Sequence, residues 1–378
     1  MLFSRNARPT RAEINLENLK FNFYSVKNFI GEDIKYMAVV KADAYGHGAV
    51  ECATMLEKAG IDCFGVALPE EGLTLRENGI KKTVICLGGF WMGQEEFLLD
   101  NNLIPVIYSL EMAEKFDKAA REKNKTAAVH IKIDTGMGRI GVRFDEATEF
   151  AGKLNQFKNL NVEGLMTHFA AADDLLENEF TDTQIKRFNQ TVEIFESKGF
   201  KLIFKDLANS PGAIAHKNSR GNMVRLGGVL YGLGGDVLPK EIDKPELRPV
   251  MALYSKINQL KIVPKGETLG YNRTYKTERD SLIATIPIGY HDGYPRSLSN
   301  RGRVIINGRF APVVGRISMD WTLIDVTEFQ DLKVNDEVIL IGDSCGLNIK
   351  AEDLAELIGT ISYEITCGIN NRVVKVYK

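Results

Sequence analysis

Apolar, strand-like runs alternate with amphipathic, helix-like segments over roughly 220 residues of this 378-residue chain. Strands that alternate with helices pair in parallel, and eight of them favour a closed (β/α)8 barrel. An open doubly wound sheet is the alternative, but no G-x-G-x-x-G fingerprint opens the first crossover. The strand-like runs span residues 36–40, 63–67, 83–87, 104–108, 128–133, 162–168, 202–207 and 223–226. The helix-like segments span residues 16–30, 49–58, 70–78, 94–100, 110–123, 145–154, 178–198 and 211–216.

The pattern changes near residue 240, where prolines interrupt a charged stretch. Such a stretch is typical of a domain boundary, so we expect a barrel over residues 1–240 and a second domain over residues 241–378. The second domain should be mostly β, with a helix at 350–357 and with Tyr363 in a further strand-like context. We expect about the first 10 residues of the chain to pack with this domain. Its strand-like runs span residues 251–263, 282–288, 303–306, 311–317, 323–326 and 337–341.

The composition excludes several function classes. The formal net charge is −2, so no general attraction to nucleic acid or to an anionic membrane is expected. No apolar run is long enough to cross a bilayer, and no apolar core follows the arginines near the N-terminus, which argues against a secretory signal. The five cysteines are scattered and form no C-x-x-C pair. We therefore expect reduced thiols in a cytoplasmic protein, without disulfides or a metal site.

Polar and charged residues gather where the strand-like runs end. In a (β/α)8 barrel the active site lies at the carboxyl ends of the strands, so these residues should share one mouth. Each has an ordinary explanation by itself, such as a packed histidine or a solvated loop arginine. Together they indicate a site for chemistry. They are Lys41 after the first run, Lys132, Asp134 and Arg139 at the fifth, His168 at the sixth, Asn209 and Ser210 after the seventh, and Arg225, Gly227 and Gly228 at the eighth.

Lys41 needs a specific reason to end a buried strand. An ammonium there is costly to desolvate unless it pairs, loses its proton or reacts. It either extends its amine to solvent or forms a Schiff base with a carbonyl cofactor such as pyridoxal phosphate (PLP). Ser210, Gly227 and Gly228 match the place where such barrels bind phosphate through backbone N–H groups and a helix N-terminus. A phosphate site beside a strand-end lysine favours PLP.

Four stretches resemble the alanine racemase family, bacterial PLP enzymes that interconvert L- and D-alanine. They occur in the family's order, and the resemblance covers the whole chain. The stretches are residues 40–48 (VKADAYGHG), 132–141 (KIDTGMGRIG), 289–296 (GYHDGYPR) and 318–320 (SMD). The resemblance implies racemisation by two bases on opposite faces of the substrate, one of which removes the α-proton while the other returns it. The product would supply D-alanine for cell-wall peptidoglycan.

The resemblance assigns the two bases. Lys41 would form the Schiff base with PLP and act on the D-alanine face, and Tyr271 would act on the L-alanine face. In the family this tyrosine reaches the barrel mouth of the partner subunit, which implies a homodimer with shared active sites. His168 would hydrogen-bond to Tyr271 and lie against Arg225, which would face the pyridine nitrogen of PLP. Because an arginine can only donate, that nitrogen would stay unprotonated and the cofactor would be a weaker electron sink.

The remaining matches to the family concern binding. Arg139 would contact the phenolic oxygen of PLP and the substrate carboxylate, and Met319 would bind that carboxylate through its backbone N–H. Tyr290 would keep the entrance narrow. Lys132 matches a position that is often carbamylated in the family, where the carbamate would fix Arg139. The phosphate contacts would come from Tyr45, Ser210, Gly227, Gly228 and Tyr363.

Two departures from the family pattern and three alternatives stay open. Ser318 stands where the family commonly has a cysteine near the substrate, and residues 370–374 lack a proline often seen there. Ser318 keeps open a racemase for serine or of broad specificity. A non-catalytic PLP carrier is the alternative of a different class, but such carriers lack the second domain that supplies Tyr271. Basic amino acid decarboxylases share the two-domain plan with different motifs around the lysine and the phosphate.

Overall fold

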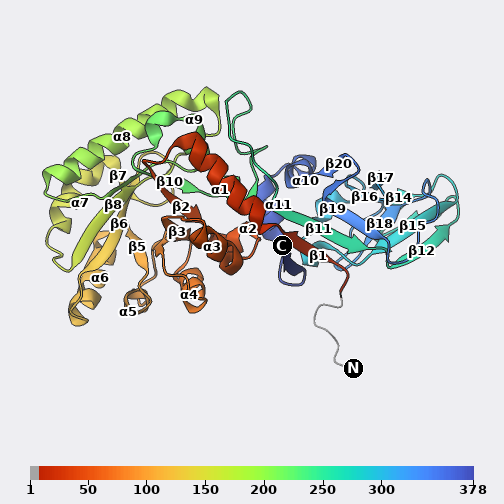
Figure 1. Ribbon diagram of the computed structural model, residues 1–378, viewed down its shortest axis with the longest axis horizontal. Helices are drawn as coiled ribbons and strands as arrows, with labels where there is room; N and C mark the ends of the chain where they lie inside the picture. The colour runs from red at the N-terminus through yellow and green to blue at the C-terminus, as the bar shows by residue number, and fades with distance from the viewer. Residues whose placement is uncertain (1–7) are drawn as a thin grey trace.

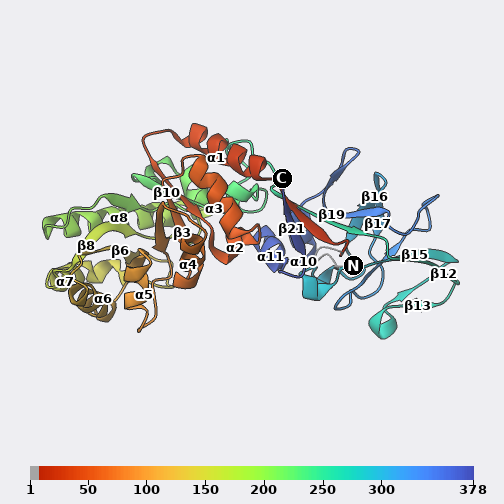
Figure 2. The ribbon, with the colours of Figure 1, turned by 60° about the horizontal axis from the view of Figure 1, so that its bottom comes forward.

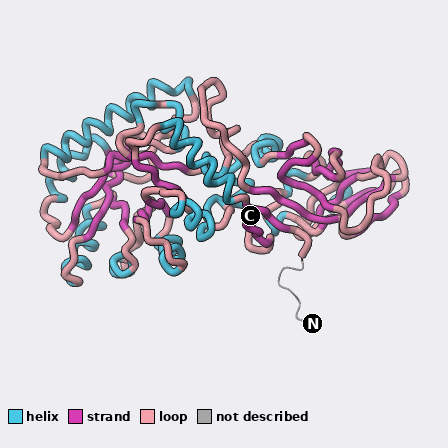
Figure 3. Tube along the Cα trace, in the orientation of Figure 1, coloured by secondary structure: helices cyan, strands magenta, loops and turns pink. Residues whose placement is uncertain are grey.

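The computed structural model describes residues 8–378. Within this part of the chain, eight parallel strands close into a barrel, because β5 and β6 at the two ends of the row also pair with each other. The predicted (β/α)8 barrel is therefore confirmed, and its helices wrap the outside (Figures 1 and 3). Its strands are β2 (Lys35–Val39), β3 (Cys63–Val66), β4 (Thr83–Cys86), β5 (Ile104–Ile107), β6 (Ala127–Asp134), β8 (Leu160–Met166), β9 (Phe204–Asp206) and β10 (Met223–Leu226), and a short β7 (Val142–Arg143) pairs with β6.

The barrel helices follow from local capping and from apolar faces. At the start of α1 (Leu16–Ile30) the side chain of Asn15 accepts the backbone N–H of Asn18, and the helix buries Phe23 and Val26. Within residues 8–378, none of the helices combines the length and the apolar character needed to cross a membrane. The other barrel helices are α2 (Lys41–Tyr45), α3 (Ala49–Lys58), α4 (Pro69–Glu77), α5 (Glu95–Asp100), α6 (Leu110–Glu122), α7 (Ala147–Leu154), α8 (Asn178–Ser197) and α9 (Ser210–Ala215).

The barrel interior has an apolar layer followed by a charged layer. The apolar layer closes one end of the barrel and consists of Met37, Cys63, Ile85, Val106, Met166 and Met223. Residues two apart on a strand face the same side, so Arg225 points to the interior one step beyond Met223. Lys132 and Asp206 lie on the interior face beside Arg225. The charged layer therefore lies beyond the apolar layer, toward the carboxyl ends of the strands.

The second domain is mostly β, as predicted. Its largest sheet has the order β17-β16-β19-β11-β1-β21, with β20 beside β19, and a three-stranded sheet has the order β12-β15-β18. The small hairpin β13-β14 lies at the end of this domain far from the barrel (Figure 2). The strands are β1 (Arg11–Ile14), β11 (Met251–Lys256), β12 (Gln259–Val263), β13 (Thr268–Leu269), β14 (Tyr275–Lys276), β15 (Ser281–Ile286), β16 (Arg303–Ile306), β17 (Arg309–Pro312), β18 (Thr322–Asp325), β19 (Glu337–Ser344), β20 (Leu347–Ile349) and β21 (Val374–Tyr377).

Two predicted strands of this domain have the wrong extent. The run 251–263 is divided into β11 and β12, which belong to different sheets. The turn between them is held by the N–H of Ile257, which donates to Asp336 O, and by that of Asn258, which donates to Thr285 O. The run 311–317 is strand only as far as Pro312, and beyond it Val313 forms a single bridge with Ile324.

The strand-like context predicted for Tyr363 is wrong. This tyrosine lies in a helix, α11 (Ser362–Gly368), which follows α10 (Ala351–Ile358). The carboxylate of Asp236 accepts both the backbone N–H and the hydroxyl of Ser362 and so caps the start of the helix. Because the cap comes from a distant part of the chain, the local pattern of β-branched and aromatic residues does not reveal it.

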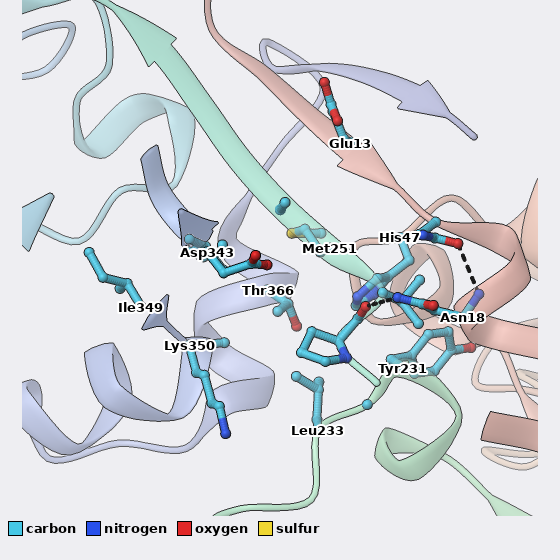
Figure 4. A pocket seen from close by; sticks show the side chains of 18 of the residues that line it. Glu13, Asn18, His47, Tyr231, Leu233, Met251, Asp343, Ile349, Lys350 and Thr366 are labelled. Atoms are coloured by element: carbon cyan, nitrogen blue, oxygen red, sulfur yellow. Dashed lines mark hydrogen bonds between the residues drawn. The ribbon is translucent and has the colours of Figure 1, made fainter. Parts of the chain in front are cut away.

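The two domains meet around β1, an N-terminal strand that lies in the second domain's sheet. It pairs antiparallel with β11 and parallel with β21. Just before it, Arg8 forms an ion pair with Asp292 at 2.6 Å. Residues 1–7, which belong to the segment expected to pack here, lie outside the described residues. A cavity of about 300 Å³ lies at this junction, with His47 and Tyr231 in its wall (Figure 4).

Candidate active site

A cavity of about 620 Å³ opens where the barrel strands end. It lies beyond the apolar layer, at the carboxyl end predicted for the site. The side chains in its wall come from separate strands and loops of the barrel and from α11. Those that the sequence singled out are Lys41, Tyr45, Lys132, Arg139, His168, Asn209, Ser210, Arg225, Gly227, Gly228 and Tyr363.

Lys41 enters the cavity from an unusual turn after β2. Residues 42–45 have φ between +53° and +55°. This left-handed conformation costs roughly 1–2 kcal/mol for each residue that carries a side chain. The carboxylate of Glu71 offsets part of that cost, because its Oε1 accepts the N–H of Ala42 at 2.7 Å. The turn therefore depends on α4, which supplies Glu71, and it aims Lys41 at the space above the charged layer.

The environment of Lys41 favours its neutral amine. Burial lowers the pKa of Lys41, and the nearby guanidinium of Arg139 lowers it further. Glu71 acts in the opposite direction but more weakly than these two. A lysine with a lowered pKa can act as a nucleophile toward a carbonyl and as a proton acceptor.

Gly227 and Gly228 pack tightly against two tyrosines and form what we call the glycine shelf. A Cβ on Gly227 would lie 2.6 Å from the hydroxyl of Tyr45, and one on Gly228 would collide with the ring of Tyr363. The two rings meet edge to face with their centroids 5.0 Å apart. Ser210 Oγ accepts the N–H of Gly227 at 2.9 Å. The hydroxyl groups of Tyr45, Ser210 and Tyr363 thus converge beside the glycine shelf at one end of the cavity, a donor set that suits an anion such as phosphate.

Arg225 forms the floor of the cavity. Its guanidinium pairs with the buried carboxylate of Asp206 and donates to Thr167 O at 2.9 Å and to Leu207 O at 3.1 Å. It also lies 3.4 Å from His168 Nδ1. Because arginine only donates, Nδ1 must accept, and the proton of the neutral imidazole lies on Nε2. Burial, followed by the charge of Arg225, lowers the pKa of His168 to about 2, so this histidine is neutral at physiological pH.

Lys132 lies in the same layer as Arg225. Its ammonium nitrogen donates to Thr167 O at 3.1 Å, the carbonyl that also accepts from Arg225. Burial lowers the pKa of Lys132 well below its ordinary value, and the charge of Arg225 adds to that shift. The cationic neighbours of Lys132 thus disfavour a further positive charge on its amine.

Of the residues that the sequence singled out, Asp134, Tyr271, Tyr290, Ser318 and Met319 do not line this cavity. Asp134 instead accepts the N–H groups of Gly136 and Gly138 in its own loop. Tyr271, Tyr290 and Met319 belong to the second domain, and their side chains are 66%, 40% and 50% exposed. Tyr271 begins a short turn next to the hairpin β13-β14, at the end of the domain far from the barrel (Figure 2). The described chain thus supplies a barrel cavity and, separately, an exposed tyrosine.

Family models match both halves of the chain. A model described as "Alanine racemase, N-terminal domain" matches residues 14–234, and one described as "Alanine racemase, C-terminal domain" matches residues 250–377. The chain belongs to the alanine racemase family. The family expected from the sequence motifs and the enzyme class that it implies are both confirmed.

Curated alanine racemases are similar over nearly the whole length of the chain. The alanine racemase of Halothermothrix orenii is 46% identical over 99% of this chain and 98% of its own length. That of Geobacter sulfurreducens is 44% identical over 98% of both chains. The similarity therefore includes both domains.

Solved alanine racemase structures share the fold. That from Clostridium difficile superposes with a TM-score of 0.93 at 41% identity, over 99% of this chain and 97% of that one. A structure of the Bartonella henselae alanine racemase with covalently bound pyridoxal phosphate has a TM-score of 0.88 at 29% identity, over 98% of this chain and 99% of that one.

Sequence reasoning missed Asp206. It lies inside the strand-like run 202–207, and the residues on either side of it gave no indication of a site. It also does not line the cavity itself. A signal was present, since an acid within an apolar run requires a partner once it is buried. The partner, Arg225, comes from the next strand around the barrel.

Proposed function

We propose that this member of the alanine racemase family interconverts L- and D-alanine with PLP held at Lys41, and so supplies D-alanine for cell-wall peptidoglycan. One observation carries the proposal: a lysine of lowered pKa shares a cavity with a shelf suited to phosphate and a floor made by an arginine. The PLP bound covalently in the Bartonella relative supports the choice of cofactor.

The residues that line the cavity fit PLP. The glycine shelf, with Tyr45, Ser210 and Tyr363 around it, offers donors and a close backbone approach to a phosphate. Arg225 at the floor would face the pyridine nitrogen, and Lys41 would bind the aldehyde carbon. When bound, PLP draws electrons from the α-carbon of an attached amino acid and so makes the α-proton acidic.

Lys41 would move the proton on one face of the substrate. Its burial favours the neutral amine, which can accept the α-proton of D-alanine and return a proton to the same face. Racemisation requires a second group on the opposite face. His168 also lines the cavity, but its lowered pKa makes this imidazole a poor base.

The second base would be Tyr271 of the partner subunit. In its own chain Tyr271 is two-thirds exposed and outside the cavity, which supports a homodimer with shared sites. Arg225 donates toward His168 Nδ1 and leaves the Nε2 proton free to be donated. A donor of this kind would stabilise the charged form of a tyrosine that enters the cavity mouth, with Tyr290 narrowing the entrance.

The carboxylate of the substrate would be bound by two residues. Arg139 lines the cavity, and a guanidinium fork suits a carboxylate. Met319 of the partner subunit would add its backbone N–H. This pairing would fix the α-carbon between the two bases, which is the positioning that proton transfer requires.

The environment of Ser318 favours alanine over serine as substrate. Its hydroxyl donates to Trp321 O at 2.9 Å and accepts the N–H of Trp321 at 3.0 Å. Both roles of the hydroxyl are thus used within its own turn, which leaves it poorly placed to recognise a serine side chain. A non-catalytic PLP carrier is disfavoured by the second domain that presents Tyr271.

The proposal is tested by proton exchange in D₂O. The protein loaded with PLP should convert L-alanine to D-alanine that carries deuterium at the α-carbon. The Tyr271→Phe variant should lose at least about 100-fold in this conversion, because general base catalysis typically contributes that much. It should still exchange the α-proton of D-alanine through Lys41.

Tyr275→Phe is the matched control. Tyr275 lies four residues away on β14, and its hydroxyl donates a hydrogen bond to Asp325 at 3.2 Å. This variant should racemise at the wild-type rate. A loaded wild-type protein that neither exchanges nor racemises alanine would refute the proposal, and turnover of serine in preference to alanine would replace it with the serine alternative.

A further inference from the structure

Asp206 is a buried carboxylate on the side of Arg225 away from the cavity. It lies on β9 with none of its surface exposed, and it pairs with the guanidinium that forms the floor of the cavity. Burial raises the pKa of Asp206, while the charge of Arg225 counteracts that effect. Because a buried acid is expensive, its presence at this position calls for a role.

The contacts of Arg225 show what Asp206 does. Two backbone carbonyls, Thr167 O and Leu207 O, accept from one terminal nitrogen of the guanidinium, and the carboxylate of Asp206 accepts from the other. These acceptors belong to the neighbouring strands β8 and β9 and to the residues that directly follow them. The carboxylate is the charged member of this set and fixes the plane of the guanidinium.

The charge balance of the floor depends on the same carboxylate. The groups that act on Lys132 through their charge are Arg225, Arg139 and Lys41 on the positive side and Asp206 on the negative side. The same three basic groups and Lys132 itself act on His168. Asp206 is the one negative charge in this set of groups. Without it, the positive charge of Arg225 would be uncompensated and would repel the other basic groups.

The second oxygen of Asp206 supports a functional role. Its Oδ2 is buried and has no hydrogen-bond partner among the described residues. A purely structural pair would be expected to satisfy both oxygens, since an unsatisfied buried acceptor costs stability. The geometry instead commits one oxygen to Arg225 and leaves the other without a donor.

We infer that Asp206 is a positioning residue that holds Arg225 as a fixed, charge-compensated donor toward the pyridine nitrogen of PLP. The inference rests on the proposed function, because it assumes PLP in this cavity. An anchored Arg225 keeps water from protonating that nitrogen, and so keeps the cofactor a weak electron sink. Asp206 thereby favours racemisation over transamination, although it touches neither the substrate nor the cofactor.

The test is the Asp206→Asn variant, which keeps the size of the side chain and removes its charge. Without substrate, the visible absorption band of the bound cofactor should shift by at least about 5 nm, because groups around the ring nitrogen tune the electronics of the cofactor. With alanine, the ratio of transamination to racemisation should rise at least about fivefold, since an unanchored Arg225 no longer excludes a proton from the ring nitrogen.

Asp117→Asn is the matched control. Asp117 is also a buried acid of the barrel, and it accepts from the backbone and side chain of Asn159 at 2.8 and 3.1 Å. Its replacement should lower the melting temperature but leave both the absorption band and the reaction ratio unchanged. An Asp206→Asn protein that behaves in the same way would overturn the inference and leave Asp206 a structural residue.

A crystal structure of the loaded wild-type protein provides a second test that does not depend on a variant that folds. Arg225 should keep its contact with Asp206 while it faces the ring nitrogen. A guanidinium that leaves Asp206 when PLP binds would overturn the inference. The absorption band can be read whether or not alanine is the substrate, so failure of the proposed reaction and failure of this inference are distinguishable.

Discussion

At the residue scale, the charged layer of the barrel controls which of its members are ionised. Lys41 and Lys132 both have a lowered pKa, and in each the largest cause is burial. His168 is held neutral by burial and by Arg225. Arg225 keeps a partner in Asp206. The layer therefore places a neutral imidazole and two lysines of lowered pKa beside the guanidinium of Arg225, a combination suited to proton transfer.

Lys132 is expected to become carbamylated. A neutral amine reacts with carbon dioxide, and burial lowers the pKa of Lys132 toward that form. The carbamate would carry a negative charge among Arg225, Arg139 and Lys41, which are the basic groups that act on Lys132. Protein equilibrated with ¹³C-bicarbonate should show one slowly exchanging carbamate signal by NMR. A Lys132→Met variant should lack it, and its absence from the wild-type protein would contradict the expectation.

At the element scale, the glycine shelf after β10 is expected to determine cofactor affinity. A Cβ on Gly228 would overlap the ring of Tyr363, so Gly228→Ala must displace either that ring or the shelf. We expect the dissociation constant for PLP to rise at least about tenfold, which corresponds to about 1.4 kcal/mol. Equilibrium titration of the apoprotein measures it.

The control for the shelf is Gly152→Ala. Gly152 lies in α7 with open space where a Cβ would be placed, so alanine should raise helix stability slightly and leave PLP affinity unchanged. Equal affinities for the Gly228→Ala variant and the wild-type protein would show that Tyr363 moves without cost, and would remove the shelf from the phosphate site.

The elements that could be predicted from sequence are those set by local pattern. The ends of the barrel strands were predicted to within two residues, because buried parallel strands form short apolar runs between helices. Tyr363 was misplaced because its helix is capped by Asp236 from a distant segment. The left-handed turn after Lys41 was also missed, since residues 42–45 contain no glycine and the turn is held by Glu71.

The same division applies to the candidate site. The polar residues at strand ends could be collected from sequence, because a parallel barrel brings those ends together whatever the side chains are. Asp206 could not be assigned, because its pairing with Arg225 depends on the register between β9 and β10. The sequence pattern shows which face of a strand a side chain lies on, but not which side chain of the neighbouring strand it pairs with.

At the scale of the whole molecule, the two residues proposed as bases lie apart in one chain. The cavity with Lys41 is in the barrel, and Tyr271 is exposed near the far end of the second domain. A closed twofold dimer is the commonest arrangement of identical subunits, and it would let each second domain serve the other barrel. We therefore propose that Tyr271 of one subunit completes the cavity of the other subunit in a homodimer.

Mixing two inactive variants tests this arrangement. Lys41→Ala lacks the lysine and Tyr271→Phe lacks the tyrosine, so each homodimer should be inactive. In a mixed dimer, one site would combine the intact lysine of one chain with the intact tyrosine of the other. Since random exchange makes half of the dimers mixed, each with one native site of two, activity should recover to about a quarter of the wild-type value. Mixing Lys41→Ala with the double variant should recover none. If tagged subunits exchange and activity does not return, the two bases must act within one chain, and Tyr271 would have to reach the cavity by a large movement of its own domain.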